Sequence, residues 1–342
     1  MTLFLILMLV FAAVLGISYA CFRMGFYVPP RKETDPDFID LPEGEIYEVF
    51  HEDMRRWTLE VRAMNREDCW ITSFDGLKLH GYYYEYAPGA PVELMFHGYR
   101  GNAERDLSGG VQRCFTLGRS ALIVDQRCSG QSEGNVITMG IHESKDCLSW
   151  LNFMLERFGP DVKIILTGIS IGAATVMMVS DQDLPDNVIG ILADCGYNSP
   201  KEIIQTIIRN MRIPVWLGYP FTRLGAQIFG HFDLEEISAV EALKNCSLPV
   251  IFFHGEDDDY VPCYMSRLCY DACASRKKLV TVPGAGHGLS YPVDPTGYFT
   301  ALWDFFGPEA SAKTRLDPEK DGPVFSAFSG KKTTMIFPYQ TA

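Results

Sequence analysis

Residues Lys163–Ser180, KIILTGISIGAATVMMVS, are the stretch that decides the fold. Ile164–Thr167 is apolar enough for a buried strand, and the small residues Ala173–Thr175 favour a helix that packs closely on a sheet. Between strand and helix stands Gly-x-Ser-x-Gly, with Ser170 at its centre. A glycine on each side lets the strand turn sharply into the helix, which holds the serine in a strained conformation with its hydroxyl exposed. We therefore predict that Ser170 is presented as a nucleophile; the alternative is a glycine-rich turn with an idle serine.

Strand-like and helix-like runs alternate on both sides of this turn. A hairpin comes first, with strands Trp70–Phe74 and Leu77–Tyr84 joined by Asp75-Gly76. Later strands are expected at Val92–Phe96, Ala121–Asp125, Lys163–Thr167, Val188–Asp194, Pro249–His254 and Lys278–Val282. Helices are expected near Ala103–Leu117, His142–Phe158, Gly172–Ser180, Met265–Ala274 and Tyr298–Phe306. An antiparallel start followed by this alternation predicts an α/β fold, with a mostly parallel sheet covered by helices on both faces.

The same patterns divide the chain into segments. We predict a transmembrane anchor at 1–28, a linker with an amphipathic helix at 29–67, an α/β domain at 68–307 and a polar tail at 308–342. Within the domain, residues at about 199–232 interrupt the alternation and are rich in large apolar side chains. We interpret them as a small helical lid that lines a pocket for an apolar group, or as a helix pair that completes the core; the two are compatible.

The N-terminus predicts attachment to a membrane. Thr2–Phe22 contains no charged residue and, as a helix, would span about 30 Å of bilayer. No Lys or Arg precedes it, unlike a typical cleaved signal peptide, so we predict an uncleaved anchor. Arg23, Arg31 and Lys32 follow it, which places the domain in the cytoplasm by the positive-inside rule. The amphipathic helix Glu45–Met64 is expected to pack the anchor onto the domain or, alternatively, to lie on the membrane surface.

Charge and cysteine usage exclude several classes of function. The net charge is −13 and basic residues are not clustered, so we expect no nucleic-acid partner. The ten cysteines form no paired CxxC motifs and there is no HExxH, so no zinc site is predicted. Scattered cysteines in this number fit a reducing compartment better than an oxidising one. We expect neither a metal nor an organic cofactor.

A serine nucleophile needs a base, and the base needs a carboxylate that orients it. On a sheet of this kind the chain order is serine, acid, histidine. His287, in the glycine-rich loop PGAGHG, is predicted to be the base, whereas His254 at a strand end is predicted to bond locally. Spacing alone does not choose the acid. The candidates are Glu256, Asp257, Asp258 and Asp259 after one strand, and Asp194 at the end of the preceding strand.

Four motifs make residues 70–306 resemble bacterial α/β-hydrolases of the serine-aminopeptidase-like and acyl-esterase-like superfamily. They are HGYRGN at 97–102, DQR at 125–127 with SEG at 132–134, the turn around Ser170, and HGEDDDYVP at 254–262. The family pattern GxxDxxVP implies that Asp258 is the acid. The resemblance also implies an oxyanion hole formed by the backbone N–H groups of Tyr99 and Ile171. The side chains of His97, Asp125 and Arg127 are expected to be structural.

Together these features predict an α/β-hydrolase fold with a helical lid and an N-terminal transmembrane helix, acting as a serine hydrolase. Ser170, His287 and Asp258 are the expected catalytic residues. An apolar lid beside a membrane favours carboxylic esters as the small-molecule substrates. One alternative is a serine aminopeptidase for short peptides, in which Glu256, Asp257 or Asp259 holds the substrate amine. Another is an α/β-hydrolase-fold protein that binds without catalysis.

Overall fold

The structure, a computed structural model, describes residues 1–29 and 37–313. The predicted linker at 29–67 and tail at 308–342 therefore lie partly outside the described residues. An eight-stranded sheet has the order β1-β2-β4-β3-β5-β6-β7-β8. Its strands are β1 (Glu67–Thr72), β2 (Lys78–Tyr84), β3 (Val92–Phe96), β4 (Ser120–Val124), β5 (Ile164–Ile169), β6 (Val188–Asp194), β7 (Val250–Gly255) and β8 (Lys277–Val282). β2 is antiparallel to β1 and β4, and all other neighbours are parallel.

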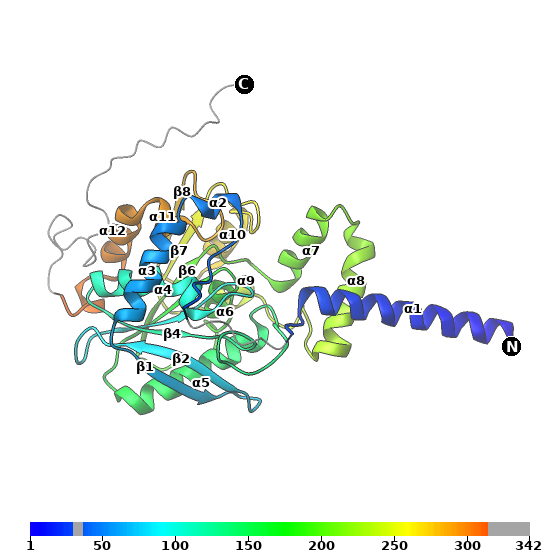
Figure 1. Ribbon diagram of the computed structural model, residues 1–342, viewed down its shortest axis with the longest axis horizontal. Helices are drawn as coiled ribbons and strands as arrows, with labels where there is room; N and C mark the ends of the chain where they lie inside the picture. The colour runs from blue at the N-terminus through cyan, green and yellow to red at the C-terminus, as the bar shows by residue number, and fades with distance from the viewer. Residues whose placement is uncertain (30–36, 314–342) are drawn as a thin grey trace, which may run out of the picture.

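Helices cover both faces of this sheet (Figure 1). One face carries α5 (Ile141–Phe158), α6 (Ile171–Met178), α9 (Ala239–Leu243) and α10 (Tyr264–Ala272). The other face carries α4 (Ala103–Thr116) and α12 (Pro295–Phe306). A short helix, η2 (Pro308–Ala310), follows α12. Successive strand residues alternate between the two cores: Ile164 and Leu166 join the first, and Ile165 joins the core under α12. The predicted α/β fold with a doubly covered, mostly parallel sheet is confirmed.

The central strand β3 contains a fully buried acid that the sequence gave no reason to expect there. Glu93 points toward the α4 face, where its carboxylate pairs with Arg113 of α4 and, at 2.6 Å, with Arg119. Thr167 Oγ1 donates to it from the neighbouring strand at 3.0 Å. Burial raises the pKa of Glu93, but the two guanidinium groups outweigh burial and hold the pKa at about 2. The carboxylate is thus a paired structural charge.

The hairpin turn is longer than predicted. The first strand ends at Thr72, whereas the sequence placed its end at Phe74. Ser73 already belongs to the turn, because its N–H donates to the carbonyl of Leu77 and its Oγ accepts from the Leu77 N–H at 2.8 Å. These bonds replace ladder pairing and close a turn around Asp75 and Gly76, whose φ is +92°.

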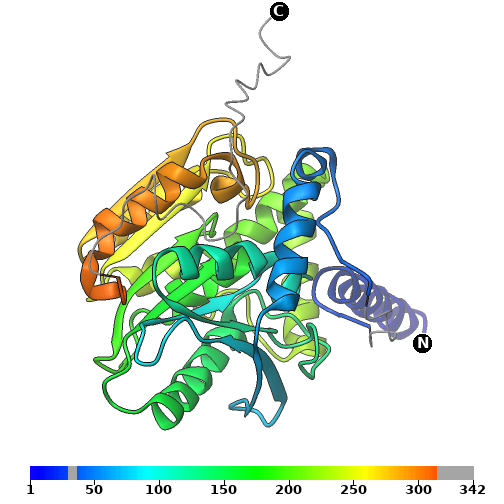
Figure 2. The same ribbon diagram turned by 60° about the vertical axis from the view of Figure 1, so that its left-hand side comes forward.

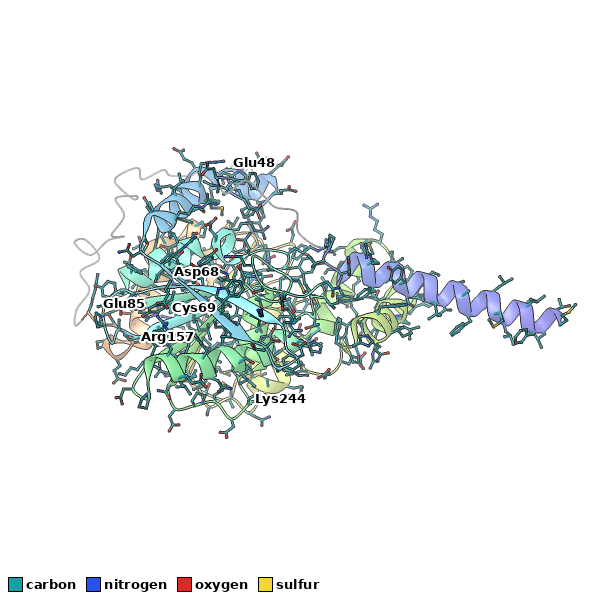
Figure 3. All side chains as sticks on the ribbon, turned by 60° about the horizontal axis from the view of Figure 1, so that its bottom comes forward. Glu48, Asp68, Cys69, Glu85, Arg157 and Lys244 are labelled. Carbon is teal, nitrogen blue, oxygen red and sulfur yellow. The ribbon has the colours of Figure 1, made fainter. Side chains whose placement is uncertain are left out.

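Helix α1 (Thr2–Gly25) leaves the side of the domain, and its side chains project freely along its N-terminal part (Figures 1 and 3). By length and composition it can cross a membrane, and of its residues only Ser18 and Phe22 are buried. Its domain-proximal end packs on α8 (Val215–Gly225) and on η1 (Ala226–Gly230). The approach is close, because a Cβ on Gly225 would lie 2.2 Å from the carbonyl oxygen of Ser18.

The predicted amphipathic helix is in fact two helices, α2 (Glu45–Glu48) and α3 (His51–Ala63). The expectation that it packs the anchor onto the domain is wrong, because α3 packs on α4 (Figure 2). Trp57 lies so close to Gly109 of α4 that a Cβ there would come within 2.9 Å of the indole. At the break between the two helices Phe50 is buried against Ala285 and Leu289, in the loop that carries His287.

The segment predicted as a lid forms α7 (Pro200–Asn210), α8 and η1. Ser199 caps α7, because its Oγ accepts from the Glu202 N–H at 3.1 Å. Ile203, Ile204 and Ile208 on the inner face of α7 are buried in the main core. This confirms that the segment completes the core. The same three side chains also line a narrow cavity, so the interpretation as a lid stays a prediction with a cavity beside it. We call residues 199–232 the lid.

Candidate active site

Ser170 lies in the turn between β5 and α6, where the backbone is strained. Its φ of +57° and ψ of −117° are unusual for a residue with a side chain. The flanking glycines are required by space: a Cβ on Gly168 would lie 2.1 Å from the backbone of Gly172, and a Cβ on Gly172 would lie 2.1 Å from the carbonyl oxygen of Phe96. The turn therefore holds Ser170 at the carboxyl end of the sheet, next to the end of β3.

Three predicted site residues come together in one hydrogen-bonded chain. His287 Nε2 lies 2.9 Å from Ser170 Oγ, and Nδ1 lies 2.7 Å from Asp258 Oδ2. Ser170 and Asp258 are buried, whereas the His287 side chain keeps 14% exposure. Burial raises the pKa of Asp258, but hydrogen bonds from His254 and His287 outweigh it and bring the pKa to about 2. At neutral pH Asp258 is thus a carboxylate that accepts Nδ1–H, which leaves Nε2 free to accept the serine proton.

The other acids are placed differently. The Asp194 carboxylate accepts from Ser290 Oγ of α11 (Ser290–Val293) at 2.9 Å, and its backbone carbonyl accepts the Ser170 N–H. Burial raises the pKa of Asp194. Glu256, Asp257 and Asp259 are exposed. Of the five candidates, Asp258 is the one bonded to the imidazole of His287.

His254 bonds locally, as predicted. Its fully buried ring lies 2.7 Å from the Val261 carbonyl through Nε2 and 2.6 Å from Ser266 Oγ through Nδ1. Nε2 is also 3.3 Å from Asp258 Oδ2. His254 therefore fixes the loop that carries the acid and also approaches the carboxylate oxygen that bonds His287.

The turn after β3 holds the first predicted oxyanion donor. Gly98 packs on the serine, because a Cβ there would lie 3.8 Å from Ser170 Cβ. Among the described residues, neither the Tyr99 nor the Ile171 backbone N–H has a hydrogen-bond acceptor. Two unoccupied amides beside a serine hydroxyl are what binding of an oxyanion requires. Asp106 supports this turn by accepting the Gly98 N–H at 2.9 Å.

The side chains of His97, Asp125 and Arg127 are structural, as expected. The His97 ring bonds the Gly98 carbonyl at 2.7 Å and accepts the Gln126 N–H at 3.0 Å. Asp125 accepts from the His80 ring at 3.0 Å and from the Ala103 N–H at 3.0 Å. Arg127 pairs with Asp146 at 2.8 Å and with Asp75 at 3.0 Å. These bonds tie the loops after β3 and β4 together.

Two cavities meet at Ser170. The larger, of about 650 Å³, is lined by α2, α3, the turn after β3 and the loop of His287. Seven residues with charged side chains line it: Glu43, Glu45, Arg105, Asp106, Arg113, Asp194 and Asp259. The narrower, of about 150 Å³, is lined mainly by apolar residues of the lid and by the end of α1. Ser170, Tyr99 and Tyr260 line both.

Sequence reasoning missed two supports of this site. Asp106 holds the turn after β3, but it lies within the amphipathic pattern of α4 and no motif marks it. Tyr47 of α2 donates through its hydroxyl to the His287 carbonyl at 3.0 Å. Only the fold brings these two residues, which lie 240 positions apart, into contact. No local signal would have identified Tyr47.

One group of possible metal ligands lies in the described part of the chain, at the same place. Ligand atoms of Cys195, Asp258 and His287 lie within 4.8 Å of one another. Burial raises the pKa of the Cys195 thiol well above its usual value, whereas metal binding requires a thiolate. Asp258 and His287 already bond to each other. This set therefore fits an oriented imidazole better than a metal ion.

Known proteins resemble this chain over most of its length. YqkD of Bacillus subtilis, uncharacterized, is 24% identical over 86% of this chain and 93% of its own. The alpha/beta hydrolase domain-containing protein WAV2 of Arabidopsis thaliana is 25% identical, over 63% of this chain and 69% of its own. The lysophosphatidylserine lipase ABHD12 of Danio rerio is 27% identical, and the match covers 55% of this chain and 49% of ABHD12. No family model matches.

A solved structure supports the same fold. The Pyrococcus furiosus esterase Pf2001 superimposes with a TM-score of 0.61 over 82% of this chain and 97% of its own. The sequence identity is 18%, so this likeness concerns the fold alone. Together with the relatives named above, it confirms the α/β-hydrolase fold that the sequence motifs implied.

Proposed function

We propose that this chain, a protein of the α/β-hydrolase superfamily, is a membrane-anchored serine hydrolase that cleaves carboxylic esters through an acyl-enzyme. The observation that carries the proposal is the hydrogen-bonded chain from Ser170 through His287 to Asp258, at the junction of two cavities. ABHD12 is named as a lipase and Pf2001 as an esterase, which favours ester over amide substrates.

In the first half of the reaction Ser170 Oγ attacks the ester carbonyl while His287 Nε2 takes the hydroxyl proton. Asp258 holds the ring by its Nδ1–H and stabilises the imidazolium that forms. The Tyr99 and Ile171 amides bind the oxyanion. When the tetrahedral intermediate collapses, the bond from the carbonyl carbon to the alcohol oxygen breaks, and Nε2–H protonates the leaving alcohol.

In the second half water replaces the alcohol. His287 Nε2 takes a proton from the water as its oxygen attacks the acyl carbon, and the same amides bind the second oxyanion. Collapse breaks the bond to Ser170 Oγ, which recovers its proton from Nε2–H. The products are a carboxylic acid and the restored serine, so the cycle needs no metal or organic cofactor.

Labelling with a fluorophosphonate and hydrolysis of p-nitrophenyl acetate test the proposal. The full-length protein is expected to be labelled at Ser170 and to hydrolyse the ester, and Ser170→Ala is expected to lose both. Ser149→Ala, on the outer part of α5, is the matched control and is expected to retain both. A wild-type protein that is neither labelled nor active would overturn the proposal in favour of a binding protein without catalysis.

A peptidase is the second candidate, because Asp259 lines the larger cavity. An exposed carboxylate there has the charge to hold a substrate amine. Comparing acetyl esters with aminoacyl amides separates the two activities. Ester hydrolysis is expected to dominate; amide hydrolysis that falls in Asp259→Asn would instead support the peptidase.

The anchor is part of the proposal. Helix α1 has the length and composition to cross a membrane, and the basic residues that follow it favour a cytoplasmic domain. Protease added to intact cells is expected to leave the domain uncut and to digest it only after lysis. Digestion from outside would place the domain on the other side, and release of the domain in the absence of detergent would indicate a cleaved signal sequence.

A further inference from the structure

The narrow cavity connects the serine with the helix proposed to lie in the membrane. Ser170 and Ile171 line it, and Ile203, Ile204 and Ile207 of the lid also contribute to its lining. The end of α1 forms another wall through Cys21, Met24 and Gly25. Helix α1 is therefore part of the site and not only an attachment.

The oxyanion turn is fastened to the same end of α1. Tyr99 donates through its hydroxyl to the Gly25 carbonyl at 2.8 Å, and Arg100 donates to the Met24 carbonyl at 3.0 Å. The wall that α1 contributes is thus fixed relative to Ser170 by two hydrogen bonds.

The outside of the lid continues the apolar surface of α1. Five large apolar residues of the lid are exposed: Met211, Ile213, Trp216, Leu217 and Ile228. Trp216 alone keeps 78% of its surface exposed. These residues lie on or beside α8 and η1, the two elements on which α1 packs (Figure 1). An exposed apolar patch that joins a membrane-crossing helix is expected to lie in the lipid, with the tryptophan near the interface.

The two cavities differ in size and lining, so they suit different parts of an ester substrate. An apolar cavity of about 150 Å³ holds one benzene-sized molecule, which corresponds to roughly six carbon atoms of one chain. The narrow cavity has this size and an apolar lining, so it fits one chain and not two. The larger cavity, with Arg105 and Asp106 on its wall, suits the polar part of the substrate.

We propose that the narrow cavity is the subsite for a single acyl chain, which enters from the lipid phase between α1 and the lid. The inference rests on the ester hydrolysis proposed above and names its substrate class: esters with one extended acyl chain, presented by a membrane or micelle. The carbonyl lies at Ser170, the first methylene groups fill the cavity, and the rest of the chain runs outward along α1 to the patch around Trp216.

Two bulky substitutions on opposite walls test the subsite in the full-length protein in detergent micelles. Ile207→Trp narrows the cavity from the lid, and Met24→Trp narrows it from α1. Both positions are partly exposed, so the added ring does not overpack the core. Expelling two methylene groups already costs about a tenfold loss of kcat/KM, so p-nitrophenyl octanoate is expected to lose at least that factor. Hydrolysis of p-nitrophenyl acetate is expected to stay within about twofold, because its acyl group ends before the blocked part of the cavity.

Gln205→Trp is the matched control, because residues two apart on a helix point to different sides and Gln205 does not line the cavity. It is expected to leave both esters unaffected. Equal losses for the two esters, or no loss for octanoate in either wall variant, would overturn the subsite. If Ile207→Trp lowers octanoate hydrolysis but Met24→Trp does not, the proposal that the acyl chain enters along α1 would be overturned. Fluorophosphonate labelling of Ser170 in each variant separates these results from failure of the proposed function, which would leave even the wild-type protein unlabelled.

Discussion

Replacing Asp258 by asparagine tests the proposed triad sharply, because the surrounding hydrogen bonds dictate how the new amide lies. Asp258 Oδ1 accepts the N–H groups of Tyr260 and Val261 at 3.0 and 2.8 Å, and Oδ2 lies 2.7 Å from His287 Nδ1. In Asp258→Asn only the amide oxygen accepts hydrogen bonds, so it stays with the two backbone donors and the NH₂ group faces the imidazole. His287 Nδ1 then has to accept, and the neutral ring carries its proton on Nε2.

A ring protonated on Nε2 cannot take the proton of Ser170, and the imidazolium of the transition state also loses its carboxylate partner. In the Ser-His-Asp template the same change lowers kcat about 10⁴-fold. At about 1.4 kcal/mol per factor of ten, this is about 5.5 kcal/mol of transition-state stabilisation. We expect a loss of that order in kcat, with little change in KM, because Asp258 is not among the residues that line the two cavities.

Steady-state hydrolysis of p-nitrophenyl acetate by the full-length protein measures both constants. Asp194→Asn is the matched control, since it makes the same change at a buried carboxylate that bonds Ser290 and not the imidazole. It is expected to keep kcat within about tenfold, because the amide oxygen still accepts the Ser290 hydroxyl. Circular dichroism checks that both variants are folded. A fully active Asp258→Asn, or a loss confined to Asp194→Asn, would refute the assignment of the acid.

Three further changes have outcomes that the structure predicts. Glu93→Gln leaves Arg113 and Arg119 buried without their charge partner, so thermal unfolding is expected to show a loss of about 3–5 kcal/mol. Tyr99→Phe removes the hydrogen bond to the end of α1; unfolding is expected to show a loss of about 1 kcal/mol, with acetate hydrolysis largely retained because the backbone N–H remains. Asp258 has a folded pKa of about 2, below the ordinary value of 3.8 for an aspartate, so its stabilisation is complete above pH 3.8 and disappears as the pH falls through the folded pKa. Wild-type protein is expected to lose about 2 kcal/mol more than Asp258→Asn between pH 5 and pH 2, as denaturant unfolding would measure; equal losses in the two proteins would contradict this.

Most of the sheet was predictable because its elements are defined locally. Val92–Phe96 and Val188–Asp194 begin and end where the sequence placed them, since both are apolar runs bounded by turn residues. The first hairpin strand was placed too far along the chain, because the Ser73 side chain competes with the ladder for backbone donors. The residue after Ser73, Phe74, is apolar and fits a strand, so the sequence did not reveal that competition.

The candidate site was predictable only in part. Ser170 and His287 stand in glycine-rich loops whose composition marks them, whereas the acid had five candidates that spacing did not separate. What distinguishes Asp258 in three dimensions is burial together with four converging donors, from His254, Tyr260, Val261 and His287. That convergence depends on two loops that meet only in the fold. The prediction of Asp258 as the acid therefore came from the resemblance to a family and not from the neighbouring residues.

The pocket beside the lid was predicted, but most of the walls of the two cavities were not, for a related reason. Their walls come from α1, α2, α3, the lid and the loops after three strands, so no sequence window contains them. The sequence indicated an apolar lid, but it suggested the wrong partner for α3, because an amphipathic pattern predicts that a face is buried and not what buries it. In the fold, that face covers α4 and the larger cavity.

The turn around Ser170 was predictable from the sequence because close contacts in the fold require its two glycines, and these glycines form part of a local motif. Gly172 has no side chain because the Phe96 carbonyl of β3 occupies the space where a Cβ would lie, and Gly168 leaves room for the first turn of α6. The close contact between the start of α6 and the end of β3 brings Ser170 next to the turn that carries the Tyr99 amide. A larger residue at Gly172 has to push the start of α6 away from the end of β3, whereas one at Gly168 has to push α6 away from its own strand. The spacing of Gly-x-Ser-x-Gly thus reflects how closely the start of α6 approaches both β5 and the end of β3.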